Sequence, residues 1–322
     1  MLSIQSISFS YDNKTVLDSI NFNIEKGKHI SIMGESGCEK STLLKALYGL
    51  ITLNKGQITY NDTKLLGPEF HLVPGHPFMK YLSQDFDLMP YISSAQNVGA
   101  FLSNFYPEKK KKRIHELLDV VGMTEYADTH VRYLSGGQQQ RIALARVLAK
   151  EPEVLLLDEP FSQIDNFKKN ELRYRLFAYL KEQKITCITA THDKEDVLAF
   201  ADEIMVIKDG YQVIKGTPKK LYNNPSNFYA ASLFAEVNKI NANLFIETGS
   251  KEILLYPHEI KISNTSPLKA TVLNCYHQGN YYGISIQIED YKLIIHSSKA
   301  YKIGIKVGIK CQPSLIKKRI NL

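Results

Sequence analysis

A glycine-containing segment between a predicted strand and a predicted helix has the residues of a phosphate-binding loop. It reads Gly34-Glu35-Ser36-Gly37-Cys38-Glu39-Lys40-Ser41-Thr42 and follows the apolar residues 30–33. In such a loop, backbone N–H groups and the start of the helix face a phosphate. The lysine reaches the β- and γ-phosphates, and the next hydroxyl ligates Mg²⁺. The segment predicts a nucleoside triphosphate site in which Lys40 and Ser41 take these roles.

The residue before the lysine departs from the usual pattern, in which a second glycine stands there. Glu39 places a carboxylate beside the predicted phosphates, and its side chain could turn to solvent or pair with Lys40. A turn that only joins a strand to a helix would explain Gly34 and Gly37, but not Lys-Ser-Thr at the start of the helix. We therefore expect a phosphate loop with weakened affinity for nucleotide.

Two predicted strands end in residues that could act on a phosphate. The apolar run 154–157 does not alternate, which is typical of a strand buried on both faces, and it ends in Asp158 and Glu159. A second buried strand, residues 185–191, delivers His192. Ligands of α/β sheets bind at the carboxyl ends of strands, so one carboxylate could hold a metal while the other handles water.

A serine and two glycines open another predicted helix, which extends to residue 150. Ser135 is a natural N-cap, and the glycines after it leave the positive end of the helix dipole and its free N–H groups uncovered. This end of the helix could bind an anion, although a lone Ser-Gly-Gly is usually only a cap.

The composition is that of an ordinary globular protein, with 44% hydrophobic and 23% charged residues in 322. The apolar runs are too short for a membrane span, and residues 1–11 have neither the basic start nor the cleavage site of a secretion signal. The four cysteines fit no metal or disulfide spacing, so we expect free thiols in a reducing cytoplasm. The net charge of +7 could attract nucleic acid or an anionic lipid surface, or be a diffuse surplus of lysine.

The hydrophobic pattern predicts an α/β domain at residues 1–236. Alternating residues predict two strands of an antiparallel patch at 2–11 and 16–24. Residues 55–62 predict a further strand and turn, and another strand ends at a loop that carries Gln84. The predicted helices cover residues 94–105, 108–121, 166–183 and 194–201, followed by a hairpin at 204–214 and a short helix from Pro218.

A β-rich domain is predicted at residues 237–322, because stretches with helical periodicity almost disappear from about Asn238 onward. Short β-rich runs are separated there by Gly, Asn, Ser and Pro, which favours a small barrel of the oligonucleotide/oligosaccharide-binding type. The predicted strands are residues 243–248, 252–256, 270–276, 281–289, 292–297 and 308–313.

Six motifs in this order and spacing resemble the ATP-binding-cassette (ABC) family over residues 1 to about 236. They are the phosphate loop, the Gln84 loop, Leu134-Ser135-Gly136-Gly137-Gln138, Leu155-Leu156-Leu157-Asp158-Glu159-Pro160, Ser162-Gln163-Ile164-Asp165 and Thr191-His192-Asp193. The resemblance implies an α/β P-loop NTPase cassette with a helical subdomain and an antiparallel β patch, followed by a small all-β barrel-like domain. The tail resembles the transport-associated domain of importer ATPases for iron, polyamine, sulfate or maltose-like substrates, and Tyr256-Pro257-His258-Glu259-Ile260 is similar to its Arg-Pro-Glu-x-hydrophobic stretch.

The resemblance also implies a head-to-tail homodimer with ATP between the phosphate loop of one copy and the Leu-Ser-Gly-Gly-Gln of the other. Tyr11 would then stack on adenine, Glu159 would act as general base, and His192 would fix the γ-phosphate. Ser41, Gln84 and Asp158 would hold Mg²⁺, with Gln84 also touching the attacking water. The residues expected to contact ATP or cross the interface are Gly34, Ser36, Gly37, Cys38, Lys40, Ser41, Thr42, Ser135, Gly137, Gln138 and Asp165.

Three functions follow as hypotheses. The first is the ATPase subunit of an importer, cytoplasmic and peripheral on the inner face of the membrane, working with integral permease subunits and an extracytoplasmic substrate-binding protein. The second is a cassette protein acting on ribosomes or nucleic acid, although such relatives usually carry two cassettes or a long coiled-coil insertion. The third is a cassette weakened by Glu39 and kept for binding or regulation. The transported substrate cannot be deduced, because specificity lies in other chains.

Overall fold

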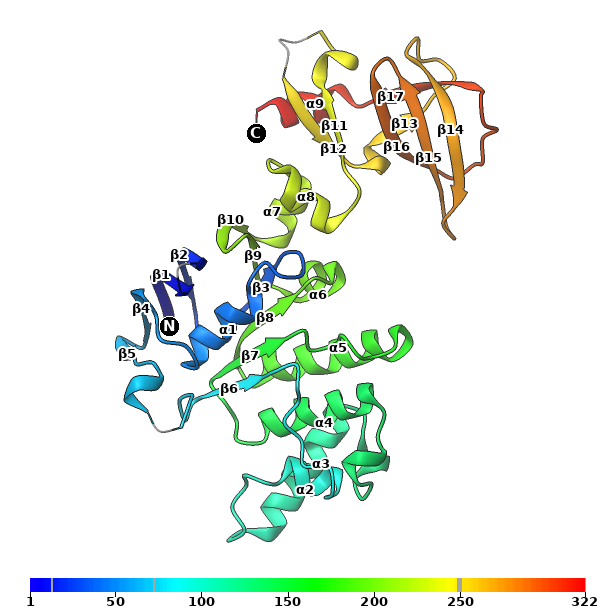
Figure 1. The fold of residues 1–322 in the computed structure, drawn as a ribbon. Coiled ribbons are helices and arrows are strands. Elements are labelled where there is room, and N and C mark those ends of the chain that lie inside the picture. Colours follow the sequence, from blue (N-terminus) through cyan, green and yellow to red (C-terminus); the bar gives the residue numbers. More distant parts are fainter. Residues whose placement is uncertain (13, 72, 248–250, 322) are drawn as a thin grey trace. The chain divides into compact units, whose positions relative to one another are not determined.

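A computed structural model describes residues 1–12, 14–71, 73–247 and 251–321 (Figure 1). The chain divides into two compact units, Met1–Pro218 and Lys219–Leu322. The sequence-based boundary at 236/237 lies further along the chain, so that the segment 219–236 packs with the second unit here. All four cysteines are free thiols.

The first unit is built on a ten-stranded sheet with the strand order β5-β4-β1-β2-β10-β9-β3-β8-β7-β6. The strands are β1 Leu2–Tyr11, β2 Lys14–Ile24, β3 His29–Met33, β4 Lys55–Tyr60, β5 Thr63–Leu65, β6 Met79–Leu82, β7 Val154–Asp158, β8 Thr186–Thr191, β9 Glu203–Lys208 and β10 Tyr211–Gly216. The pairs β9/β3, β3/β8, β8/β7 and β7/β6 are parallel. Strands β1 and β2 form the predicted antiparallel patch, and β4 and β5 extend it.

Burial explains the two kinds of strand. Every residue of β3, β7 and β8 is buried, and these strands have unbroken or nearly unbroken apolar and small residues. In the antiparallel patch, apolar side chains such as Ile4, Ile7 and Phe9 of β1 are buried while several of their neighbours face water. The parallel strands therefore run together through the core and end along one edge of the sheet.

Six helices of the first unit lie in the described residues. They are α1 Lys40–Tyr48, α2 Ser94–Val98, α3 Pro107–Val120, α4 Gly136–Leu148, α5 Asn166–Glu182 and α6 Lys194–Phe200. Figure 1 shows α2, α3 and α4 grouped beside β6, where they form the predicted helical subdomain. Short 3-10 turns occupy Pro68–Phe70, Thr124–Tyr126 and Val131–Tyr133.

The helix predicted at 94–105 is wrong in its second half. Helix α2 ends at Val98, and the N–H of Gly99 caps it by donating to the carbonyl of Ala95 at 2.9 Å. A Cβ at Gly99 would lie 2.6 Å from Ile114 Cδ1 and 2.9 Å from Lys110 Cε, so a larger residue there would have to displace these two side chains of α3. The apolar residues that suggested a longer helix, including Phe101 and Phe105, are exposed in the loop that follows.

The second unit contains the predicted barrel-like antiparallel sheet. Its elements are α7 Pro218–Asn223, which begins at the boundary, α8 Phe228–Phe234, β11 Asn238–Asn241, β12 Glu252–Leu255, β13 Ile260–Ile262, β14 Lys269–His277, β15 Tyr282–Ile288, β16 Tyr291–Ser297, β17 Lys306–Cys311 and α9 Pro313–Ile320, with 3-10 turns at Ala242–Leu244 and Pro257–Glu259. The strand order is β13-β17-β14-β15-β16, with β11 and β12 forming a separate pair. Ile284, Ile286 and Ile295 are fully buried in its core.

Two predictions for this unit are wrong. The strand expected at 243–248 begins as a 3-10 turn, because Asn241 Oδ1 accepts a hydrogen bond from the N–H of Asn243 at 2.9 Å; its last residue lies outside the described residues. The β-rich run 308–313 ends at Cys311, and Pro313 starts helix α9 instead. The pattern also missed α8 and the short strands β11 and β13.

Candidate active site

The phosphate loop joins β3 to α1, and close packing dictates its first glycine. A Cβ at Gly34 would lie 2.4 Å from both Cys38 Sγ and the carbonyl oxygen of Ile207. Gly37 has φ +82°, a left-handed conformation that costs glycine little. Close packing therefore requires the glycine at position 34, whereas the left-handed backbone favours glycine at position 37.

Lys40 is folded into this loop. Its side chain is only 7% exposed, and Nζ donates hydrogen bonds to the carbonyl oxygens of Gly34 at 2.8 Å and Glu35 at 2.9 Å. Cys38 Sγ lies 3.7 Å from the same nitrogen, and burial raises the pKa of this thiol. The loop thus encloses one positive charge, as a phosphate site requires.

Glu39 adopts the left-handed conformation, with φ 73° and ψ 23°, just before α1 begins. This is the conformation for which glycine is favoured, which gives a physical reason for the glycine of the usual pattern. The half-buried side chain takes neither of the two expected positions. Its Oε2 accepts a hydrogen bond from the Thr42 hydroxyl at 2.7 Å, while Lys40 donates to backbone carbonyls.

A cavity of about 480 Å³ brings together residues from four distant segments. The phosphate loop and α1 form one side, and the ends of β6, β7 and β8 contribute the rest. The predicted site residues that line it are Ser36, Gly37, Lys40, Ser41, Thr42, Gln84, Glu159 and His192, together with Glu39, Ser162 and Gln163.

Asp158, the last residue of β7, has the properties of a metal ligand. It is 3% exposed, and its Oδ2 accepts a hydrogen bond from the Tyr81 hydroxyl at 3.2 Å. Burial, and then the charge of Asp158, raise the pKa of Tyr81. The other oxygen, Oδ1, is buried without a hydrogen-bond partner among the described residues. A buried carboxylate oxygen without a partner fits a divalent cation, and Ser41 and Gln84 of the neighbouring cavity offer further oxygen ligands.

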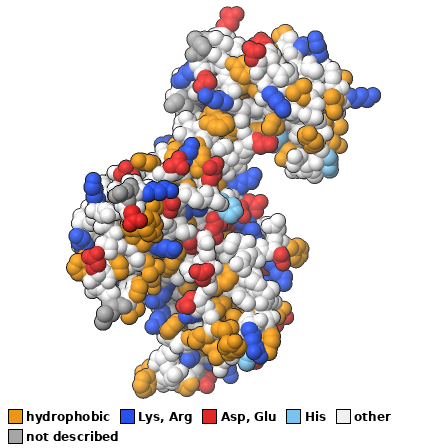
Figure 2. Space-filling view, in the orientation of Figure 1, with side chains coloured by type: hydrophobic (Ala, Val, Ile, Leu, Met, Phe, Trp, Pro, Cys, Tyr) orange, Lys and Arg blue, Asp and Glu red, His pale blue; other side chains and the backbone are white. Residues whose placement is uncertain are grey.

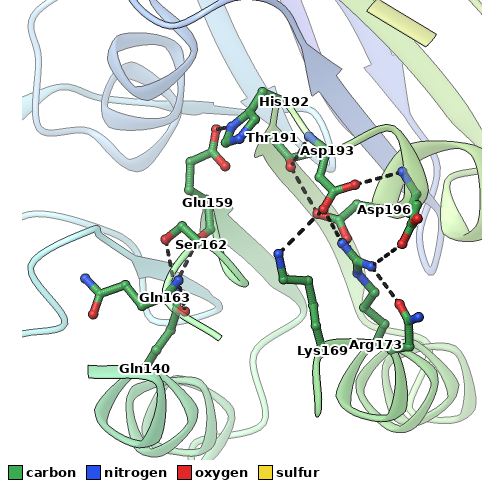
Figure 3. Close-up of polar contacts among 12 residues, drawn as sticks. Gln140, Glu159, Ser162, Gln163, Lys169, Arg173, Thr191, His192, Asp193 and Asp196 are labelled. Carbon is green, nitrogen blue, oxygen red and sulfur yellow. Dashed lines mark hydrogen bonds and ion pairs between the residues drawn. The ribbon is translucent and has the colours of Figure 1, made fainter. Parts of the chain in front are cut away.

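Glu159 and His192 contact each other across the ends of β7 and β8 (Figure 3). His192 Nδ1 lies 2.9 Å from Glu159 Oε1 and donates a hydrogen bond to it. Glu159 has φ 48°, and its N–H donates to the carbonyl of Ala190 at 2.9 Å, which holds it against β8. This left-handed turn re-aims the glutamate into the cavity, whereas Asp158 stays buried beside Tyr81.

A buried glutamine connects Glu159 to α4. Gln140 Nε2 donates to the carbonyl of Glu159 at 2.9 Å and to Ser162 Oγ at 3.3 Å, while its Oε1 accepts from the N–H of Gln163 at 3.0 Å (Figure 3). Sequence reasoning missed this residue. Its signal was a glutamine two positions after Leu-Ser-Gly-Gly-Gln, one turn before the apolar residues Ile142, Ala143 and Leu144.

A second missed residue, Arg173 of α5, supports the loop after His192. Its side chain is 2% exposed, and its nitrogens contact Asp193 at 2.5 Å, Glu195 at 2.9 Å and Asp196. Burial raises the pKa of Asp196 to about 6, against the opposing effect of Arg173. The pKa of Asp193 is lowered: burial acts to raise it, but the N–H of Glu195 and the charge of Arg173 outweigh that. The loop that carries His192 is thereby fixed to α5.

The remaining predicted residues do not line the cavity of the single chain. Ser135 caps α4: its Oγ accepts from the N–H of Gln138 at 3.3 Å, and its own N–H donates to Gln138 Oε1 at 2.8 Å. Gly137 lies against Gln163, because a Cβ there would be 2.6 Å from the Gln163 carbonyl oxygen. Tyr11 is 54% exposed beside Phe9, and Asp165 is exposed at the start of α5. The contact of these groups with nucleotide, in the same chain or in a second copy, stays a prediction.

The geometry defines a class of protein. A strand, a phosphate loop and a helix stand beside strand-end carboxylates on a parallel sheet, which is the arrangement of phosphate-loop nucleotide-binding proteins.

Comparison with known proteins gives the family. The family described as "ABC transporter" matches residues 17–162. The chain is 30% identical to the spermidine/putrescine import ATP-binding protein PotA of Bacteroides fragilis (strain YCH46), over 97% of this chain and 72% of that protein. The chain belongs to the ABC transporter family.

Solved structures agree with this assignment. The dimeric post-hydrolysis state of the ATP-binding cassette MJ0796, bound to ADP and Pi, is 26% identical with a TM-score of 0.60, covering 68% of this chain and 99% of that one. CbiO1 from Clostridium perfringens, part of the ABC transporter complex CbiONQ, is 29% identical with a TM-score of 0.61, covering 69% and 90%.

The protein is thus the ATP-hydrolysing subunit of an ABC importer, and these matches do not favour the ribosome, nucleic-acid or weakened-cassette hypotheses. Within the described ranges, no helix combines the length and the apolar character needed to cross a membrane.

Proposed function

We propose that this chain binds Mg²⁺ and ATP in the cavity beside the phosphate loop and hydrolyses ATP to drive a separate membrane permease. The observation that carries the proposal is the convergence of Lys40, Gln84, Glu159 and His192 on one cavity, from segments up to about 150 residues apart. Positioning and charge stabilisation of this kind are the main sources of catalysis in phosphoryl transfer.

In the proposed reaction, Glu159 accepts a proton from the attacking water as general base. The water oxygen forms a bond to the γ-phosphorus as the bond to the β–γ bridging oxygen breaks, and ADP leaves with that electron pair. The contact between His192 and Glu159 orients the carboxylate, and the exposed imidazole is free to reach the γ-phosphate. Lys40 compensates the charge on the β- and γ-phosphates.

Asp158, Ser41 and Gln84 would hold the magnesium ion. The support is the buried Asp158 Oδ1 that lacks a hydrogen-bond partner in the described chain. Bound there, Mg²⁺ would neutralise charge on the phosphate oxygens. The protein's own part is to keep this carboxylate buried and fixed through Tyr81.

The proposed active form is a head-to-tail homodimer. Ser135, Gly137 and Gln138 of one copy would meet the ATP held by the phosphate loop of the other, Tyr11 would stack on adenine, and Asp165 would cross the interface. The capped and accessible start of α4 supports this arrangement, because its N–H groups and dipole can receive an anion from outside the chain.

The proposed partners are integral permease subunits and an extracytoplasmic substrate-binding protein, with this chain at the cytoplasmic face of the membrane. The relative PotA is named as a spermidine/putrescine import protein, so polyamines are the first substrates to test. No nucleic acid is expected as a partner.

The test is hydrolysis by the full chain at saturating Mg-ATP, compared with Glu159→Gln. Loss of the general base should lower turnover by about 100-fold or more while ATP binding is kept. The variant should then elute with ATP at twice the monomer mass of 36.6 kDa. Glu171→Gln, on the exposed face of α5, is the matched control and should hydrolyse ATP normally. Parental turnover by Glu159→Gln would disprove the catalytic assignment.

A further inference from the structure

The loop between α2 and α3 exposes three aromatic side chains within six residues. Phe101 is 56% exposed, Phe105 is 91% exposed and Tyr106 is 63% exposed. Apolar rings at adjacent positions on a surface usually mark a contact with another molecule or a membrane. This loop is also where the chain leaves the helical pattern that its sequence suggested.

Basic side chains lie over two of these rings, Phe101 and Tyr106. Lys109 Nζ lies 5.1 Å from the centre of the Tyr106 ring, and Lys150 Nζ, just beyond α4, lies 5.5 Å from the centre of the Phe101 ring. We name the surface formed by Phe101, Phe105, Tyr106, Lys109, Lys110 and Lys150 the lysine–aromatic patch. In Figure 2, hydrophobic and basic side chains adjoin over the part of the first unit that holds α2 and α3.

The patch borders an open hollow of about 340 Å³. Four basic side chains and one carboxylate line it beside Tyr106, namely Lys109, Lys110, Arg113, Lys150 and Glu151. The segments 101–113 and 150–151 together contain six basic and two acidic residues. Arg113 is already engaged, since it donates to the carbonyl of Leu148 at 2.9 Å and pairs with Glu116 at 2.9 Å. Lys110 Nζ donates to the neutral Asn104 Oδ1 at 2.8 Å and keeps its charge. The ammonium groups of Lys109, Lys110 and Lys150 therefore supply the positive charge that would attract an external anion.

We propose that the lysine–aromatic patch binds the surface of an anionic phospholipid membrane. Lysines beside exposed aromatic rings are the combination found where proteins lie in the headgroup region, with the rings at the acyl boundary and the charges on lipid phosphates. Phe105 would enter the interface, and the hollow would receive a lipid phosphate.

The arrangement favours a membrane over single-stranded nucleic acid. Base stacking needs free ring faces along a groove. In the patch, ammonium groups already cover one face of Phe101 and one face of Tyr106, and the most exposed ring, Phe105, projects from a loop. The inference goes beyond the proposed ATPase function, because it assigns membrane contact to this chain itself in the absence of a permease.

The test is co-sedimentation of the full chain with phosphatidylcholine vesicles, with and without phosphatidylglycerol. The chain should bind only the vesicles that contain phosphatidylglycerol, and binding should weaken as salt is added. Lys109→Gln with Lys150→Gln should lower the partition coefficient roughly 30-fold, equivalent to about 1 kcal/mol for each charge. Phe105→Ser should lower it about tenfold and leave the salt dependence in place.

The matched control is Phe167→Ser with Lys168→Gln, which removes a 94% exposed phenylalanine and an adjacent lysine from α5. This variant should bind vesicles normally. ATPase activity of the patch variants should be unchanged, which excludes unfolding. Failure of vesicle binding in the parent with ATPase intact would overturn the membrane proposal alone. If a single-stranded oligonucleotide binds more tightly than vesicles and the same variants lose that binding, the patch is a nucleic-acid site. If millimolar inorganic phosphate inhibits vesicle binding, the patch is a site for free phosphate.

Discussion

Glu39 Oε2 accepts a hydrogen bond from the Thr42 hydroxyl at 2.7 Å, across the first turn of α1. This bond holds a carboxylate on the wall of the cavity in which we propose that the phosphates bind. It also leaves Lys40 to the backbone carbonyls of the loop, so the lysine is not neutralised by its neighbour. The Glu39 carboxylate therefore repels the phosphates of a bound nucleotide, but it does not neutralise the Lys40 ammonium group that attracts them.

Replacing Glu39 should strengthen ATP binding. A carboxylate about 4 Å from a phosphate oxygen costs about 1 kcal/mol in water and up to about 4 kcal/mol at an effective dielectric constant near 20. We expect Glu39→Gly to lower the Kd for Mg-ATP at least tenfold, which is about 1.4 kcal/mol. Isothermal titration of both proteins measures this.

The variant Glu39→Gln separates the two effects of the residue. It removes the charge but keeps a side chain in the left-handed conformation. Compared with Glu39→Gly, it should therefore show most of the gain in affinity for Mg-ATP and little of the gain in unfolding free energy. Glu39→Gly should additionally raise the free energy of unfolding by about 1 kcal/mol through relief of the backbone. Equal, tight binding by the parent and both variants would show that the loop tolerates the carboxylate.

Arg173→Met should destabilise the protein strongly. The change would leave Asp196, whose side chain is 3% exposed, without its compensating charge, and breaking a buried ion pair costs about 3–5 kcal/mol. Arg175→Met on the same helix is the control, since its partner Glu171 and Arg175 itself are exposed, and should cost less than about 1 kcal/mol. Urea unfolding followed by circular dichroism gives both values; similar losses would contradict the role of Arg173.

His29 should make the stability depend on pH. Its ring is buried against Phe177, and burial lowers the pKa of the imidazole from 6.5 to about 4. The neutral ring donates from Nδ1 to the Phe200 carbonyl at 3.0 Å and accepts at Nε2 from Thr189 at 2.8 Å. The unfolded chain is protonated first, so the stability falls as the pH drops from about 6.5 to about 4, by up to about 1.4 kcal/mol per pH unit.

The measurement is the difference in unfolding free energy between the parent and His29→Gln across that pH range. Contributions common to both proteins, such as that of Asp196, cancel in this difference. The variant should be less stable at neutral pH, but its deficit should shrink as the pH falls. His115→Gln, which removes an exposed histidine, is the control variant for the loss of one imidazole. A flat curve for His29→Gln would mean that the buried ring titrates normally.

Truncation should distinguish the two possible domain boundaries. Phe234 of α8 is 2% exposed, and Tyr222 stacks on Tyr256 at 4.7 Å, so the segment 219–236 is covered by the second unit. Fragments 1–218 and 1–236 should both keep the ATP affinity of the full chain. The longer fragment should bind a hydrophobic dye, because α8 has lost its cover. If fragment 1–218 aggregates while fragment 1–236 stays soluble and does not bind the dye, the boundary at 236/237 is favoured.

The fold of the first unit was largely predictable, because its signals are local. The phosphate loop is one continuous segment, and the strands that end at Asp158 and His192 are apolar runs whose positions need no knowledge of their partners. The loop after Gly99 was misread, because its aromatic residues have the spacing of a helix although they face solvent.

Residues that act through distant contacts could not be found in the same way. Arg173 meets Asp193 across 20 positions, and Gln140 meets Gln163 across 23. Neither Arg173 nor Gln140 belongs to a sequence motif from which its partner could be predicted. In the second unit, Asn241 favours a 3-10 turn through a side-chain hydrogen bond, and a pattern of apolar residues does not reveal such a bond.

Gln140 has a consequence for how two nucleotides in a dimer would affect each other. In the proposed head-to-tail arrangement, the start of α4 touches the ATP held by the other copy, whereas Glu159 acts on the ATP of its own copy. One buried amide spans both elements, so a movement of α4 on contact with one nucleotide displaces the backbone that aims the base at the other. Gln140→Leu should therefore reduce the Hill coefficient of hydrolysis more than it changes the affinity for ATP. Each of the two sites would then hydrolyse ATP independently of the other, although the two copies remain a dimer.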